Sequence, residues 1–250
     1  MSVFNPDLMQ GKVVLVTGGG TGIGKGIARL FAEHGAQAVI CSRKEEVLQA
    51  TATELRDAGL SCDYQVCDIR DYAQVEAMLD ALLQAHGRLD VVVNNAAGNF
   101  PATIEQLSAN GFRTVVDIDL NGTFNITRAA YSAWLAEHGG AIVNITAPFA
   151  GWGVAYQAHA AAAKAGVDSL TRTCAVEWRN KGIRVNAVAP GSVANTEGLA
   201  RLSEALTGDA EPELQCLPAD IANAVLFLAS SDGSYVNGVD LQVDGGLAQI

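Results

Sequence analysis

A glycine-rich segment near the start of the chain has the spacing of a phosphate-binding loop. Residues 17–24 read Thr-Gly-Gly-Gly-Thr-Gly-Ile-Gly, and a helical pattern with Ile27, Leu30 and Phe31 on one face follows. Glycine permits positive φ, lets the backbone approach a phosphate and lets the helix pack closely on a strand. The helix N-terminus then offers free N–H groups and the positive end of its dipole to a pyrophosphate. The segment predicts a dinucleotide site, the alternative being a flexible turn.

The end of the second predicted strand bears on the choice between the two nicotinamide dinucleotides. Residues 41–44 read Cys-Ser-Arg-Lys, and the first acid after them is Glu45. NAD-binding sheets usually place an acid there for the ribose hydroxyls, whereas a carboxylate would repel the 2′-phosphate of NADPH. Arg43 can hold that phosphate bidentately and Ser42 can donate to it. The pattern favours NADPH, the alternative being that Arg43 and Lys44 only begin a solvated helix.

Short β-branched runs alternate with helical patterns along the chain, and these elements must position both sites. The predicted strands span residues 12–17, 36–41, 61–66, 89–93, 141–145, 183–188 and 239–243. Several are apolar on both faces, as in a parallel sheet covered by helices on each side. The clearest helix spans 71–85, with Asp71 as its N-cap. We predict a single-domain, doubly wound α/β Rossmann fold with a seven-stranded parallel sheet, whose ligands bind beyond the carboxyl ends of the strands.

Length and cysteine content fit one large domain in a reducing compartment. A chain of 250 residues buries about 70–75% of its unfolded surface and needs no disulfide or metal for stability. The five cysteines are an odd number without C-x-x-C or histidine-paired spacing, which argues against a disulfide framework and a zinc site. We therefore predict no metal and a cytoplasmic protein.

Charge and hydropathy argue against two classes of partner. The formal net charge is −11 and the acids are distributed, so no clustered positive surface for nucleic acid is visible. The apolar stretches are too short to span a membrane, and residues 1–10 lack the basic and apolar regions of a signal peptide. Residues 247–250 read Leu-Ala-Gln-Ile, which is not a peroxisomal tripeptide of the Ser-Lys-Leu kind. We expect no nucleic-acid partner and no membrane partner.

Motifs at the strand ends resemble one enzyme family over nearly the whole chain. The glycine segment has the spacing Thr-Gly-x-x-x-Gly-x-Gly, and Asn-Asn-Ala-Ala-Gly follows the fourth strand at 94–98. Lys164 lies on a helix after the fifth strand, and Pro190 and Gly191 follow the sixth. This order resembles the short-chain dehydrogenase/reductase family. The resemblance implies one domain over 1–250, a flexible substrate-binding segment at 191–217, and a homotetramer formed through the long helices around Asp119 and Lys164.

The resemblance also implies which residues bind the dinucleotide. In the family, the residue in the place of Asp68 contacts adenine, and the residue in the place of Lys164 binds the nicotinamide ribose. The implied NADPH contacts are Gly18, Thr21, Gly22, Ile23, Gly24, Ser42, Arg43, Asp68, Ile69, Asn94, Asn95, Ala96, Lys164, Pro190, Gly191 and Val193.

The chain lacks the family's usual proton donor. Four residues before Lys164, where the family has a tyrosine, the sequence has Ala160, and the usual serine position holds Ala147. Neither methyl group can transfer a proton, and general acid catalysis is worth ~10²–10⁴ in rate, so ordinary alcohol dehydrogenase chemistry is not expected. Tyr156 would lie about 12 Å from Lys164 along a continuous helix, and needs an irregular helix start to reach the site. His159 would point roughly 100° away, as a packed or interface histidine.

An acid takes the place of a residue that is usually asparagine in the family. Residues 118–122 read Ile-Asp-Leu-Asn-Gly, which puts Asp119 at that position. In a site lined by Ala147 and Ala160 this carboxyl would be desolvated, and its pKa would rise. The alternative is a surface acid on an amphipathic helix. Asp117, two residues earlier, should face a different way.

These departures together resemble the 2,4-dienoyl-CoA reductases, and most closely the peroxisomal type. The residues that carry the resemblance are Asn-Asn-Ala-Ala-Gly-Asn-Phe at 94–100, Asp-Ile-Asp at 117–119, Gly-Thr-Phe-Asn at 122–125, His-Ala at 159–160, Val-Glu-Trp at 176–178 and Thr-Glu-Gly-Leu at 196–199. Peroxisomal members also lack the tyrosine and have an acid like Asp119. The resemblance implies NADPH-dependent reduction of 2,4-dienoyl-CoA to 3-enoyl-CoA in unsaturated fatty acid β-oxidation, in a bacterial relative. Asp119, Lys164 and Asn95 would be its catalytic residues.

The chemistry of that reaction does not need a phenol. Hydride adds to the far end of the diene and gives a dienolate, which requires donors for its oxygen and a proton for carbon. Asn95 or a water would supply the former, and Asp119, protonated or acting through a water, the latter. Lys164 would bind the nicotinamide ribose and offset negative charge.

The substrate contacts are less sharply defined by the sequence than the cofactor contacts. Phe100 would pack on the acyl chain, Thr196 lies in the segment over the substrate, and Arg70, Arg113 and Arg201 are candidates for the CoA phosphates, although each fits a solvated surface group as well. The stretch 199–218 is acidic and shorter than in the reductases it resembles. Two alternatives therefore stay open. One is a catalytically impaired NADP-binding scaffold or sensor, and the other reduces a different alkene or carbonyl with a relocated proton donor.

Overall fold

One parallel sheet forms the centre of the molecule. The computed structural model describes residues 4–151, 153–196, 198–200 and 215–247. The described strands lie in the order β3-β2-β1-β4-β5-β6-β7, and each neighbouring pair is parallel. Their bounds are β1 Val13–Thr17, β2 Gln37–Ser42, β3 Cys62–Val66, β4 Val91–Asn94, β5 Gly140–Ile145, β6 Ile183–Pro190 and β7 Asp240–Val243. This confirms the predicted seven-stranded doubly wound fold, with each strand end within two residues of its predicted position.

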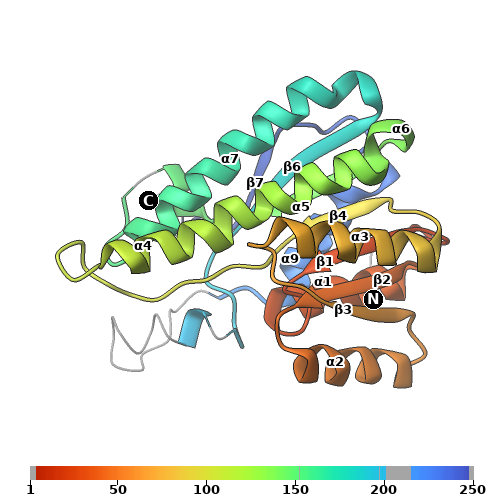
Figure 1. The fold of residues 1–250 in the computed structure, drawn as a ribbon, viewed down its shortest axis with the longest axis horizontal. Helices are drawn as coiled ribbons and strands as arrows, with labels where there is room; N and C mark the ends of the chain where they lie inside the picture. The colour runs from red at the N-terminus through yellow and green to blue at the C-terminus, as the bar shows by residue number, and fades with distance from the viewer. Residues whose placement is uncertain (1–3, 152, 197, 201–214, 248–250) are drawn as a thin grey trace.

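Helices cover both faces of the sheet, so the strands are apolar on both sides (Figure 1). Along β1, Val14 and Val16 pack toward one helix layer, whereas Val13 and Leu15 pack toward the other. The first layer contains α1 Gly22–Glu33, α2 Glu45–Asp57 and α9 Pro218–Ala229. The second contains α3 Tyr72–His86, α5 Gly122–Ala130 and α7 Ala158–Trp178. Short 3₁₀ turns span Pro148–Gly151, Arg179–Lys181 and Ser231–Gly233.

Local capping explains where α3 begins and ends. The Asp71 carboxylate accepts hydrogen bonds from the backbone N–H groups of Ala73 and Gln74, which confirms its prediction as the N-cap. Gly87 ends the helix at φ 70°, a left-handed conformation in which glycine pays no Cβ penalty. The predicted helix at 71–85 thus lies one residue from the observed one.

The helix between β4 and β5 is long and contains two π-helical turns. It runs as α4 Ala109–Val116, a π turn Asp117–Asn121, α5 Gly122–Ala130, a second π turn Tyr131–Leu135 and α6 Ala136–His138 (Figure 1). Its backbone remains right-handed helical through both junctions. Single π turns inside α-helices occur frequently at functional sites. The first one carries Asp119.

A half-buried arginine closes the C-terminal end of α9. The Arg184 guanidinium, on β6, donates to the carbonyl oxygens of Leu228, Ala229, Ser230 and Gly233. Burial lowers the pKa of Arg184, and the carbonyls that it satisfies are those that a helix end leaves without partners. Among the described helices, none is both long and apolar enough to cross a membrane.

Candidate active site

The glycine loop is shaped to accept a phosphate. Gly18 and Gly22 have φ of +64° and +51°, and a Cβ on Gly24 would lie 2.3 Å from the carbonyl oxygen of Gly18. Helix α1 begins at Gly22, and its N-cap, Thr21, makes no side-chain capping hydrogen bond. The first N–H groups of α1 therefore remain free for a ligand, as anion binding at a helix N-terminus requires. The loop fits the pyrophosphate of a dinucleotide.

The carboxyl end of β2 has the positive charge expected beside a 2′-phosphate, whereas an ion pair follows β3. Ser42 is half-buried and Arg43 is exposed directly after it. Asp68 accepts hydrogen bonds from Arg70 at 2.9 and 3.1 Å, and its pKa is lowered first by those bonds, with Arg43 contributing through its charge. Arg70 thus lies at the adenosine end of the predicted site in an ion pair. Its role in binding CoA phosphates stays a prediction, and this ion pair competes with it.

A cavity of about 570 Å³ opens beyond the carboxyl ends of β4, β5 and β6. Of the predicted site residues it brings together Ile23, Asn95, Lys164, Pro190, Gly191, Val193 and Thr196. Its wall is mainly apolar, with Phe149, Val154, Leu199 and Leu247 among the contributors. Concave apolar sites with a few polar groups are typical of small-molecule binding. The cavity lies at the edge of the sheet where doubly wound folds bind their ligands.

Lys164 reaches from α7 into this cavity and is nearly buried. Its Nζ donates to the carbonyl oxygen of Ile145 at 2.8 Å and lies 3.7 Å from Oδ2 of Asp119. The lysine is 7% exposed. A cation fixed in this way stabilises negative charge that develops beside it, because water does not screen it.

Asp119 lies directly behind Lys164, in the π turn. It is 1% exposed, and its Oδ1 accepts a hydrogen bond from the backbone N–H of Gly98 at 2.7 Å. Burial raises the pKa of Asp119, although Lys164, Gly98 and His159 oppose the shift. The desolvated acid is thus confirmed and the surface-acid alternative is wrong. Asp119 does not line the cavity itself but meets it through Lys164.

The side-chain amides of two asparagines at the end of β4 donate hydrogen bonds within the protein. The amide of Asn95 donates to the carbonyl oxygens of Thr17 and Gly18, at 2.9 and 3.2 Å. The prediction that Asn95 donates to an enolate oxygen is therefore corrected, because both amide hydrogens are already engaged. The amide of Asn94 donates to Thr127 and Asn144 inside the fold, and the contact of Asn94 with the cofactor stays a prediction.

The positions of the missing hydroxyl groups are buried and apolar. Ala147 and Ala160 are 8% and 3% exposed. Helix α7 begins at Ala158, so the continuous helix assumed for Tyr156 does not exist; Tyr156 has φ 66°, is exposed and does not line the cavity. His159 is fully buried and its Nδ1 accepts from the N–H of Ala160, which puts the proton of the neutral ring on Nε2. Burial lowers its pKa, as expected for a packed histidine.

The predicted substrate contacts are only partly brought together. Phe100 packs edge-on against His159, with ring centroids 4.5 Å apart, and it does not line the cavity. Thr196 lines the cavity and faces Gly22 of the glycine loop. Arg201 and residues 201–214 of the predicted flexible segment lie outside the described residues. Arg113 is exposed on α4.

A pair of polar residues is among the parts of the cavity wall that the sequence reasoning missed. The side-chain amide of Asn99 donates to Oε1 of Gln157 at 2.6 Å, and both residues line the cavity. Asn99 belongs to the motif at 94–100, but nothing in the sequence pairs it with Gln157, which lies 58 residues away.

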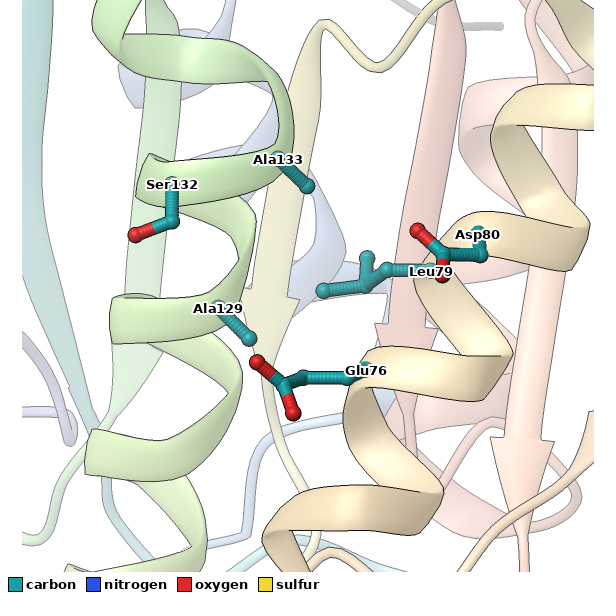
Figure 2. Close-up of a pocket in the computed structure, with 6 residues that line it drawn as sticks. All are labelled: Glu76, Leu79, Asp80, Ala129, Ser132 and Ala133. Carbon is teal, nitrogen blue, oxygen red and sulfur yellow. The ribbon is translucent and has the colours of Figure 1, made fainter.

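A second hollow, of about 380 Å³, lies between α3 and the long helix and has different chemistry. Figure 2 shows Glu76 reaching from α3 toward the facing helix, with Asp80 and Leu79 beside it and Ala129, Ser132 and Ala133 opposite. None of the predicted site residues lines it. Among the described residues no group of histidine, cysteine and acidic side chains could hold a metal.

The sequence matches one protein family and several characterised enzymes over most of its length. The profile of the family described as enoyl-(acyl carrier protein) reductase matches residues 18–248. The chain is 45% identical over 251 residues to the (3E)-enoyl-CoA-producing peroxisomal 2,4-dienoyl-CoA reductase of Rattus norvegicus, covering 98% of this chain and 86% of that protein. It is 41% identical over 249 residues to a probable (2E)-enoyl-CoA-producing 2,4-dienoyl-CoA reductase of Bacillus subtilis (strain 168), covering 95% and 97%.

Solved structures give the same fold. A citronellol catabolism dehydrogenase of Pseudomonas aeruginosa PAO1 superposes with a TM-score of 0.88 at 36% identity, covering 99% of both chains. An actinorhodin polyketide ketoreductase variant crystallised with NADPH superposes with a TM-score of 0.90 at 31% identity, covering 96% of this chain and 98% of the other.

Proposed function

Because this chain belongs to the short-chain dehydrogenase/reductase family, we propose that it is an oxidoreductase that reduces 2,4-dienoyl-CoA to 3-enoyl-CoA with NADPH, in the β-oxidation of unsaturated fatty acids. One observation carries the assignment. A buried Asp119–Lys164 pair stands beside the cavity, while the hydroxyl positions of a carbonyl reductase hold Ala160 and Ala147. The site therefore suits a substrate that forms an enolate and not an alkoxide.

The cofactor site fits NADPH. The glycine loop and the N-terminus of α1 would hold the pyrophosphate, Ser42 and Arg43 would hold the 2′-phosphate, and Lys164 would bind the nicotinamide ribose. NADPH, when bound, supplies a hydride. The ketoreductase that superposes on this fold carries the same cofactor in its crystal structure, which supports the choice.

The substrate's own electrons explain why no tyrosine is needed. Hydride adds with its electron pair to C5, the two conjugated π bonds shift by one position, and the displaced pair comes to the thioester oxygen as a dienolate. Protonation at C2 returns the pair to carbon and leaves a double bond between C3 and C4. Asp119, whose pKa burial raises, holds the proton, and it passes to C2 through a water. Lys164 offsets the negative charge of the dienolate.

The position of protonation decides the product. Protonation at C4 instead of C2 would leave the double bond between C2 and C3, and the names of the rat and Bacillus relatives differ on this isomer. We propose the 3-enoyl product on the greater identity to the rat protein, 45% against 41%.

The test is turnover of purified protein with NADPH and a 2,4-dienoyl-CoA, with 2-enoyl-CoA and 3-oxoacyl-CoA as controls. We expect NADPH to be oxidised with the 2,4-dienoyl-CoA and with neither control substrate, and we expect NMR of the product to show the 3-enoyl isomer. Turnover of only a control would refute the dienoyl assignment. Tight NADPH binding without any turnover would favour the scaffold or sensor, and a 2-enoyl product would refute C2 protonation.

Compartment and assembly complete the proposal. The five cysteines are all free, four of them buried, which supports a reducing, cytoplasmic location. A homotetramer through the long helices is supported by large apolar side chains left exposed on them, namely Phe112 on α4, Phe124 on α5 and Val176 on α7. The mass of the native protein in solution tests the tetramer.

A further inference from the structure

The cavity wall contains a buried amide with an unused donor. Gln157 is 1% exposed and precedes α7, and its Oε1 is held by the amide of Asn99 at 2.6 Å. Its Nε2 is buried without a hydrogen-bond partner. A buried donor left unpaired costs about 1–3 kcal/mol, so its presence in a folded protein indicates a functional role or an unseen partner such as a ligand.

Three other polar side chains of the cavity are already engaged in hydrogen bonds within the protein. Asn95 donates to Thr17 and Gly18, Lys164 donates to Ile145, and the hydroxyl of Thr146 lies within hydrogen-bond distance of Val188 and Asp240. Among the described residues, the buried unpartnered donors are Nε2 of Gln157 and Nε2 of His159. Of these two residues, Gln157 lines the cavity and His159 does not.

We propose that Gln157 is the hydrogen-bond donor for the thioester carbonyl oxygen of the substrate, and for the enolate oxygen that this atom becomes. Asn99 positions the amide by holding Oε1. Since Nε2 has no protein partner, a small turn of the amide toward the cavity breaks no hydrogen bond at that atom. The donor thus takes over the oxygen-anchoring role for which Ala147 and Ala160 have no group. This inference rests on the proposed function, because it requires an acyl thioester.

The donor should act mainly on the rate and less on substrate binding. A thioester carbonyl oxygen is a weak acceptor, and it becomes a strong one when the dienolate forms, so the hydrogen bond strengthens toward the transition state. Removing one donor of this kind lowers kcat by about 10²–10³. KM should change only severalfold, by roughly the value of a neutral hydrogen bond.

Gln157→Met tests the inference, because methionine has similar length and volume but no N–H group. With NADPH and 2,4-dienoyl-CoA, we expect kcat to fall about 10²–10³-fold while the melting temperature and NADPH affinity stay near those of the wild type. Gln157→Glu keeps the Asn99 contact but loses the amide donor, so its kcat should also be low. It serves as the test variant if Gln157→Met does not fold. Gln49→Met, at an exposed position of α2, is the matched control and should be unchanged.

A spectroscopic measurement separates this inference from the proposed function. The protein is mixed with NADP⁺ and 2,4-dienoyl-CoA carrying ¹³C at the thioester carbon, so that binding occurs without turnover. We expect the infrared carbonyl band to shift to lower frequency in the wild type and to lose that shift in Gln157→Met. An absent shift in the wild type overturns the inference whether or not the diene is reduced. Equal shifts in the wild type and Gln157→Met would assign the donor to another group and overturn the inference. Full activity of Gln157→Met together with a slow Asn99→Asp variant would do the same.

Discussion

Replacing Asp119 by asparagine removes a proton while leaving almost everything else in place. Asparagine has the size of aspartate and keeps an oxygen for the N–H of Gly98, which Oδ1 accepts at 2.7 Å. The change takes away the one group of the buried pair that can hold the proton for carbon. Because Asp119 does not line the cavity, NADPH affinity should stay near normal.

The size of the effect follows from two costs. Loss of a positioned general acid lowers kcat by ~10²–10⁴, or about 3–5 kcal/mol of barrier. The variant also leaves Lys164 buried without its carboxylate. Breaking an ionised buried pair costs about 3–5 kcal/mol of stability, but burial raises the pKa of Asp119 despite Lys164. The neutral side chain is therefore favoured in the fold, and a neutral asparagine should cost less than that range. The rate effect therefore exceeds what partial unfolding at assay temperature would produce.

The raised pKa of Asp119 sets the direction in which activity and stability change with pH. Burial raises the pKa of Asp119, so the protonated form persists above its ordinary range, and kcat should fall as pH rises through the raised pKa. For stability, the folded state binds this proton more tightly than the unfolded state. Asp119 therefore contributes its full stabilisation at pH values below its pKa in the unfolded chain. This stabilisation is lost as pH rises through the higher pKa of the folded state. Both slopes should be absent in Asp119→Asn.

The assay measures kcat for 2,4-dienoyl-CoA against pH, NADPH affinity by fluorescence, and the free energy of unfolding in urea. Asp117→Asn, at a half-buried acid in the same π turn, is the matched control and should behave as wild type. Wild-type turnover by Asp119→Asn, or an unchanged pH profile with reduced turnover, would refute the role of this carboxyl.

Three further substitutions test the cofactor site and the scaffold. Arg43→Ala should weaken NADPH about 10–100-fold, the value of a hydrogen bond to a charged group, and leave NADH binding unchanged; equal losses for both would contradict the 2′-phosphate site. Gly24→Ala places a Cβ 2.3 Å from the carbonyl oxygen of Gly18, so calorimetry should show NADPH binding weakened at least about tenfold, and normal binding would disprove the tight loop. Arg184→Met should lower the urea-derived free energy of unfolding by about 2–5 kcal/mol, because several carbonyls lose their donor; Arg172→Met, an exposed i,i+4 pair, should cost under about 0.5 kcal/mol, and equal losses would contradict the capping role.

Much of the fold was predictable because the signals that specify it are local. Strand positions follow from short β-branched runs, the start of α3 from the capping carboxylate of Asp71, and the phosphate loop from glycine spacing next to a strand and a helix. The burial of Asp119 was also predictable, because the motif places it where the family usually has an active-site asparagine, and it is 1% exposed. Each of these inferences uses neighbours in the chain or one motif.

The partners of the polar side chains were decided by the tertiary structure. Asn95 was expected to face a substrate, but its amide is engaged by Thr17 and Gly18, 78 and 77 residues away. No sequence pattern marked Gln157 as a site residue. It is distinguished by its hydrogen bond with Asn99, 58 residues away, and by an Nε2 that has no hydrogen-bond partner. A sequence pattern places a residue on an element, but which donors are already satisfied depends on backbone carbonyls that approach from distant strands. The chain alone therefore determined the dinucleotide site, the missing tyrosine and the buried acid, whereas folding decided which amide is left free for the substrate.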